Sequence, residues 1–123
     1  MKLEDQCISL ELAKRLKELG VKQHSCFYYV RTNNLSQEYS IVTVSGANFD
    51  MSFLFSSFTV AELGDILPKG GWTQESTYGG TRVWFIDPEF PHKEKSFTYD
   101  ESEANARAKM LIYLIENKLI ETN

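Results

Sequence analysis

Residues 103–120 read EANARAKMLIYLIENKLI, a stretch that contains neither glycine nor proline. Its apolar residues recur at helical spacing, with small side chains first and large ones later: Ala104, Ala108, Leu111, Ile115 and Leu119. Small residues at the start of a helix let it approach a sheet closely, so this stretch predicts a long C-terminal helix packed on strands. Asp100 and Glu103 have the spacing of a capping box, which would begin that helix.

Two further residues of the stretch, Met110 and Leu114, make its apolar face unusually wide. A helix on the surface of one chain needs a narrower apolar stripe. We therefore expect a homo-oligomer, in which this helix also meets a second subunit.

A β-hairpin is predicted at residues 72–86, WTQESTYGGTRVWFI. If Gly79 and Gly80 form a two-residue turn, Tyr78 lies opposite Thr81 and Glu75 lies opposite Trp84. Alternation then gives one face that consists of Trp72, Tyr78, Val83 and Phe85. The other face carries Arg82, Trp84 and Ile86.

The rest of the chain predicts smaller elements on both sides of these two. Ser9 and Gly20 delimit an N-terminal helix in SLELAKRLKELG, and Thr59 and Glu62 form a capping box for a short middle helix. Aromatic and β-branched runs predict strands at residues 25–31, 39–44 and 96–99. The order α-β-β-α-β-β-β-α indicates one α+β domain over residues 1–123, an antiparallel sheet with an N-terminal helix, a short middle helix and the long C-terminal helix packed on it.

Residues 45–58, SGANFDMSFLFSSF, concentrate phenylalanine in a segment that lacks both clear strand alternation and helical period. One interpretation is that the segment fills the core. The alternative is an apolar flap that closes over a ligand or another subunit, because exposed patches of that size usually mark contacts.

Composition narrows the class of protein. The net charge of −4 and the 42% of hydrophobic residues are typical of a globular domain without the basic footprint of a duplex-binding protein. The 2 cysteines lie outside any CxxC arrangement and the 2 histidines lack metal-ligand spacing, so we expect neither metal nor cofactor. The acidic start is unlike a signal peptide and no apolar run could span a bilayer, so we expect no membrane contact and a cytoplasmic location.

Three stretches resemble small proteins encoded by bacteriophages and prophages: SLELAKRLKELGVKQHSCFYYV (9–30), FTVAELGDILP (58–68) and EANARAKMLIYLIENKLI (103–120). The resemblance implies a viral origin and expression inside a bacterial host cell. It carries over no catalytic residue. Small phage proteins of this kind are often accessory or counter-defence factors.

Candidate binding residues fall into three groups. In the first, Arg82 lies beside Trp84, an arrangement of charge and ring with which proteins hold a phosphate next to a stacked base. The alternative is that Arg82 pairs with Glu75 and lies over Trp84 as surface packing. A second group shares one face of the strand at 25–31 and consists of Phe27, Tyr29 and Arg31. A third lies in a proline-bounded loop and consists of His92, Lys93 and Lys95.

The sequence contains no Walker loop, GxSxG or HExxH signature, so we expect a protein that is not an enzyme. The favoured function is a binding module for a small anionic, nucleotide-like ligand, used in a phage setting to sequester a nucleotide signal of host immunity. The alternative is direct binding of a host protein through residues 45–58 or the last helix. DNA binding is less favoured because the helix-turn-helix pattern of the first helix continues into a strand-like run, HSCFYYVR.

Overall fold

The computed structural model describes residues 3–31, 39–43, 54–69, 71–86 and 96–120. Their helices are α1 (Leu3–Gln6), α2 (Leu10–Glu18), α3 (Val60–Ile66) and α4 (Glu103–Glu116). Their strands are β1 (Phe27–Arg31), β2 (Tyr39–Thr43), β3 (Phe55–Ser56), β4 (Trp72–Thr77), β5 (Gly80–Phe85) and β6 (Ser96–Asp100). The predicted α+β class is confirmed.

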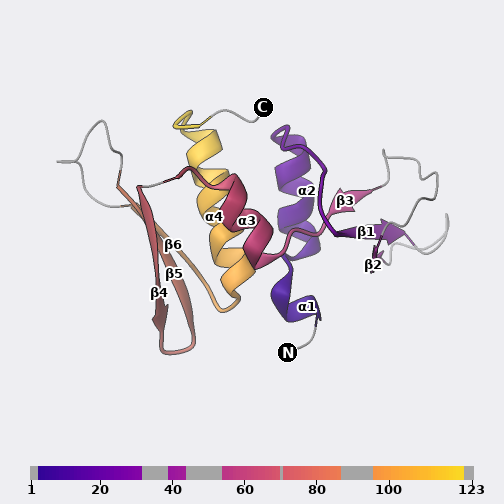
Figure 1. The fold of residues 1–123 in the computed structure, drawn as a ribbon, viewed down its shortest axis with the longest axis horizontal. Coiled ribbons are helices and arrows are strands. Elements are labelled where there is room, and N and C mark those ends of the chain that lie inside the picture. The colour runs from indigo at the N-terminus through magenta and orange to yellow at the C-terminus, as the bar shows by residue number, and fades with distance from the viewer. Residues whose placement is uncertain (1–2, 32–38, 44–53, 70, 87–95, 121–123) are drawn as a thin grey trace.

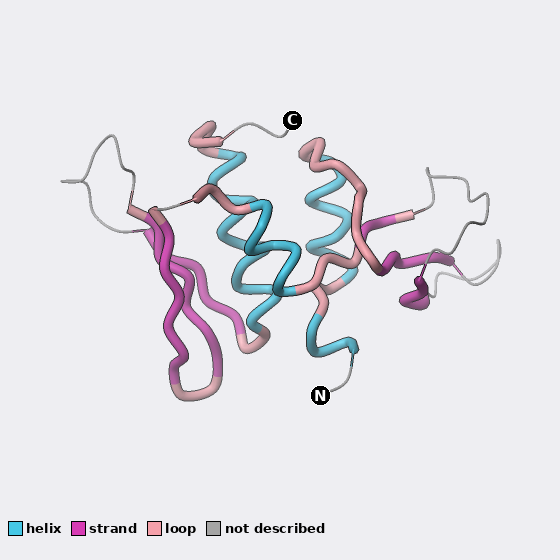
Figure 2. Tube along the Cα trace, in the orientation of Figure 1, coloured by secondary structure: helices cyan, strands magenta, loops and turns pink. Residues whose placement is uncertain are grey.

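The strands form two three-stranded antiparallel sheets, ordered β2-β1-β3 and β4-β5-β6, where the sequence had predicted one sheet. The sheets lie at opposite ends of the molecule with the helices between them (Figure 1). Figure 2 shows the same separation between the two groups of strands. One cluster of buried side chains nevertheless contains residues from both ends of the chain, with Ile8 as its first member in the sequence and Leu114 as its last.

The predicted C-terminal helix is the centre of this cluster. α4 contacts β5 and β6 on one side and α2 and α3 on another. Its buried side chains are Ala104, Ala106, Ala108, Met110, Leu111, Ile112 and Leu114. Met110 and Leu114 are both 0% exposed within a single chain. The wide apolar face that suggested a second subunit is therefore covered by the chain's own sheet and helices, and the helix ends at Glu116.

Local capping signals were mostly reliable. Ser9 Oγ accepts from the backbone N–H of Leu12 at the start of α2, and Gly20 follows the helix with φ of 90°. The Thr59–Glu62 capping box of α3 is present with both of its hydrogen bonds.

The predicted box at the start of α4 was wrong in register. The cap is Ser102, whose Oγ accepts from Asn105 N–H at 3.2 Å, and Glu103 is already the first helical residue. Asp100 instead accepts from the backbone N–H of Ser102 at 2.9 Å.

The hairpin register also differs from the prediction. Thr77 pairs with Gly80, so the turn residues are Tyr78 and Gly79, and Glu75 lies opposite Arg82 instead of Trp84. The positive φ of 89° falls on Gly79. The partner of each β4 residue is shifted by two positions along β5, and side chains alternate with a period of two, so the two faces keep their predicted members. Tyr78 is the exception, because it lies fully exposed in the turn.

The phenylalanine-rich segment is described from Leu54 onward. Leu54 and Phe58 are buried, and Phe55 lies half-buried in β3, so this end of the segment belongs to the core and to an edge strand. The part of the proposed flap at residues 45–53 lies outside the described residues.

Candidate anion-binding site

The predicted pair Arg82 and Trp84 lies on the outer face of the β4-β5-β6 sheet. Arg82 Nη1 lies 3.3 Å from Glu75 Oε1, and Trp84 Nε1 donates to the same oxygen at 3.2 Å. The Arg82 guanidinium lies 5.5 Å from the centroid of the Phe97 ring, which also packs on Trp84 with 4.8 Å between centroids. Arg82 thus pairs with Glu75, as the packing alternative predicted. The ring that its guanidinium covers is that of Phe97, however, and not that of Trp84.

The second predicted group lies in the other sheet, on the far side of the helices (Figure 1). Tyr29 is half-buried against the core, and its hydroxyl donates to the carbonyl of Ile8 at 2.7 Å. Phe27 is half-buried, and the Arg31 backbone pairs with Tyr39. The structure therefore does not bring the first two groups together, and His92, Lys93 and Lys95 lie outside the described residues.

A different cationic pocket is formed by α2 and the sheet beside it. Lys14 and Lys17 are three positions apart, so they project from one side of α2. The β1 strand holds β2 on one edge and β3 on the other, and this places the Tyr39 and Phe55 rings 5.9 Å apart. The pocket has a volume of about 310 Å³ and is lined by Lys14, Lys17, Glu18 and Phe55.

Both ammonium groups of this pocket lie over aromatic rings. Lys17 Nζ is 4.9 Å and Lys14 Nζ is 5.8 Å from the centroid of Phe55. Lys14 Nζ is also 5.2 Å from the centroid of Tyr39. Lys17 is fixed in place because its ammonium donates to the carbonyl of Leu54 at 2.8 Å.

Among the described residues that line this pocket, the one carboxylate is that of Glu18. Its Oε2 pairs with Arg15 Nη1 at 3.2 Å, so it has a cation of its own. The pocket combines two ammonium groups with an aromatic ring and therefore suits an anion that also presents a flat apolar surface.

Sequence reasoning missed this pocket because its parts come from distant segments. A lysine pair on the polar side of an amphipathic helix is usually a solvated face. The only available signal was Phe55 in the phenylalanine-rich segment, and its pairing with Tyr29 could not be predicted from a strand of two residues.

Cys7 and the acidic side chains are the remaining chemically reactive or metal-binding groups of interest. Cys7 is buried, and burial raises the pKa of its thiol; the Glu62 carboxylate acts in the same direction. A protonated thiol is a poor nucleophile. The described residues contain no group of three His, Cys, Asp or Glu side chains that could hold a metal ion.

Comparison of the chain with protein-family models, with curated proteins and with solved structures found no match. Within the described segments, no helix has both the length and the apolar character needed to cross a membrane.

Proposed function

We propose that the protein is a non-enzymatic binding module whose ligand is a small anion with a planar ring, as in a nucleotide. The observation that supports this proposal is the pair of ammonium groups, Lys14 and Lys17, within 6 Å of the Phe55 ring. The proposal keeps the ligand class that the sequence predicted and moves the site from Arg82 and Trp84 to the pocket beside α2.

The two kinds of side chain supply different parts of the recognition. An ammonium group binds a phosphate by charge-assisted hydrogen bonds, each contributing about 1.5–3 kcal/mol. An aromatic ring stacks on a base, which is worth about 1–3 kcal/mol per base. No reacting group is needed for either contact, so the ligand leaves unchanged.

The biological setting of this proposal comes from the resemblance to phage-encoded proteins. A module that holds a nucleotide without changing it would lower the free concentration of that nucleotide in the host cytoplasm. Sequestration of a nucleotide signal of host immunity is the form of this activity that would serve a phage.

Calorimetric titration with AMP, adenosine and ribose 5-phosphate tests the proposed site. We expect AMP to bind more tightly than either fragment, because only AMP engages the lysines and the ring together. Lys14→Gln should weaken AMP binding about ten- to a hundredfold, from the loss of one charge-assisted hydrogen bond.

The matched control is Lys22→Gln, which removes the same charge from an exposed residue beyond the end of α2. Equal weakening by both substitutions would show that only net charge matters and would refute the site. Failure of the wild-type protein to bind AMP at millimolar concentration would refute the ligand class.

Direct binding of a protein is a second candidate, supported by exposed aromatic side chains of the β4-β5-β6 sheet. Tyr78, Phe97 and Tyr99 are 106%, 52% and 41% exposed. The last helix no longer supports this function, because its apolar face is buried.

Sedimentation velocity of the wild-type protein and of Phe97→Lys separates two partners for this face. A dimer that dissociates on substitution supports the expected homo-oligomer. A monomer in both samples contradicts self-association at the face and favours a host protein as its partner.

A further inference from the structure

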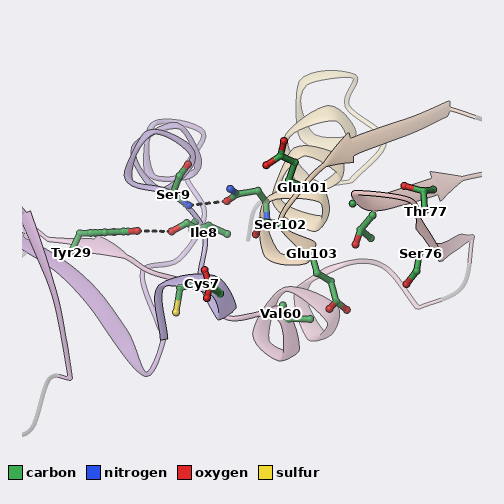
Figure 3. A pocket seen from close by; sticks show the side chains of 14 residues that line it. Cys7, Ile8, Ser9, Tyr29, Val60, Ser76, Thr77, Glu101, Ser102 and Glu103 are labelled. Atoms are coloured by element: carbon green, nitrogen blue, oxygen red, sulfur yellow. Dashed lines mark hydrogen bonds between the residues drawn. The ribbon is translucent and has the colours of Figure 1, made fainter. Parts of the chain in front are cut away.

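A cleft in the described part of the chain lies where the beginnings of α2 and α4 meet the tip of the β4–β5 hairpin. Its volume is about 860 Å³, a size suited to an organic ligand. Figure 3 shows side chains from the N-terminal segment, from β1, from α3, from the hairpin and from the start of α4 arranged around it. Segments that are far apart in the sequence therefore form one concave surface.

The charge of this cleft is opposite to that of the lysine pocket. Among the described residues, its lining includes the carboxylates of Asp5, Glu101 and Glu103 and no lysine, arginine or histidine. Glu103 has an ion-pair partner in Arg107, at 3.6 Å. Asp5 and Glu101 are exposed and form no ion pair with any residue that the structure describes.

A hydroxyl group without a described partner lies in the same cleft. Thr81 is only 8% exposed, lines the cleft, and makes no side-chain hydrogen bond to the described residues. Polar side chains that are largely buried usually form hydrogen bonds in folded proteins, so the Thr81 hydroxyl is available to bond a ligand group in this cleft.

Other polar residues of the lining already have partners. Ser9 N–H donates to Asn105 Oδ1, and the Tyr29 hydroxyl donates to Ile8. Glu103 at the beginning of α4 also complements the helix dipole. The groups left to bind a ligand are the carboxylates of Asp5 and Glu101 and the hydroxyl of Thr81.

These groups are arranged for an extended cation and not for a metal ion. The described residues contain no group of three acidic, histidine or cysteine side chains close enough to hold a metal. We propose that this cleft binds a small organic polyamine, whose ammonium groups reach the separate carboxylates and donate to the Thr81 hydroxyl. The site is independent of the lysine pocket and takes a ligand of the opposite charge.

Calorimetric titration of the full chain with spermidine tests this site. We expect Glu101→Gln and Asp5→Asn each to weaken spermidine binding at least about fivefold. Thr81→Val keeps the shape and charge of the cleft but removes a hydroxyl, and it should weaken binding about threefold or more. A thermal melt of each variant establishes that it is folded.

Two controls make the result decisive. Asp65→Asn removes a carboxylate from an exposed position of α3 outside the cleft and should leave spermidine affinity unchanged. Lys14→Gln, in the lysine pocket, should also leave spermidine affinity unchanged. The two proposed sites are therefore tested by different variants, and the failure of one proposal can be distinguished from the failure of the other.

Three results of these titrations would overturn the proposal. They are the absence of spermidine binding to the wild-type protein, an equal loss of affinity in Asp65→Asn and Glu101→Gln, and unchanged affinity in Thr81→Val. Displacement of spermidine by an equal concentration of MgCl₂ would also overturn it, because diffuse attraction of counterions predicts that result.

Discussion

Asn105 Oδ1 accepts a hydrogen bond of 2.8 Å from the backbone N–H of Ser9, across 96 positions of sequence. Ser9 caps α2 and Asn105 lies in the first turn of α4, so this bond joins the beginnings of the first long helix and the last. It also closes one wall of the acidic cleft.

Asn105→Ala should destabilise the protein by about 1–3 kcal/mol, because the half-buried N–H of Ser9 loses its acceptor. Asn105→Asp keeps an acceptor oxygen for Ser9 N–H near a helix N-terminus but loses the bond of Asn105 to Asp100, so it should recover only part of that loss. Urea denaturation of both variants measures the difference. Equal losses would mean that the side chain acts through packing alone.

Gly80→Ala should destabilise the hairpin strongly. A Cβ at this position would lie 2.6 Å from the carbonyl oxygen of Asp100 and 2.6 Å from the hydroxyl of Tyr99. Overpacking of this kind costs about 1–3 kcal/mol, and the backbone oxygen cannot move without breaking the β5–β6 register. Thermal melts provide the measurement.

Gly64→Ala is the matched comparison for that substitution. Its Cβ would meet only the end of the Arg107 side chain, at 2.7 Å, and alanine is a better helix former than glycine by about 0.5–1 kcal/mol. We expect a much smaller change in melting temperature than for Gly80→Ala, and a loss as large as that one would contradict the steric explanation.

Glu62→Ala should cost more stability than Thr59→Ala. Removal of the Thr59 cap leaves one N–H of α3 without its acceptor, at a typical cost of about 1 kcal/mol. Glu62 accepts from Thr59 N–H through Oε1 and from Cys26 N–H through Oε2, both at 3.0 Å, so its loss affects two segments. Chemical denaturation ranks the variants, and Thr59→Ser, which keeps the hydroxyl, should remain close to wild type.

The Asp100–Lys109 pair predicts a pH dependence of stability. Burial raises the pKa of the Asp100 carboxyl, but the hydrogen bond and charge of Lys109, with further bonds from Ser102 and Asn105, outweigh it and hold the pKa below its ordinary value. A carboxyl with a depressed pKa in the folded state contributes stability that is present above its unfolded pKa, about 4, and lost as the pH falls through the folded pKa.

Asp100→Asn should therefore lower the free energy of unfolding at pH 7, and the difference from wild type should shrink below about pH 4. Urea titrations between pH 2 and pH 7 test this. A difference that stays constant with pH would show that ionisation of Asp100 contributes nothing.

Elements with strong local signals were predictable from the sequence. The helical period of residues 103–120, the Ser9 cap and the Thr59–Glu62 box are each decided within a few positions. The hairpin register was not predictable, because Gly79 and Gly80 both fit a turn. In the structure the Tyr99 hydroxyl, from the neighbouring strand β6, donates to the Gly79 carbonyl.

The division into two sheets and the candidate sites depend on contacts between distant segments. β3 has two residues and pairs with β1 only in the folded chain. Phe55 meets Lys17, and Thr81 meets the start of α4, because the core brings three separate segments together. No periodicity or spacing within one segment carries that information.

The position of α4 has a consequence for biosynthesis. Ribosomes release the N-terminal segments first, and domains generally fold as units during or after that release. In this protein α2, α3 and the β4-β5-β6 sheet all pack against a helix that begins only at Glu103. Nascent chains that lack α4 would expose Leu16, Leu63 and Val83, so we expect the core to close only after α4 has left the ribosome.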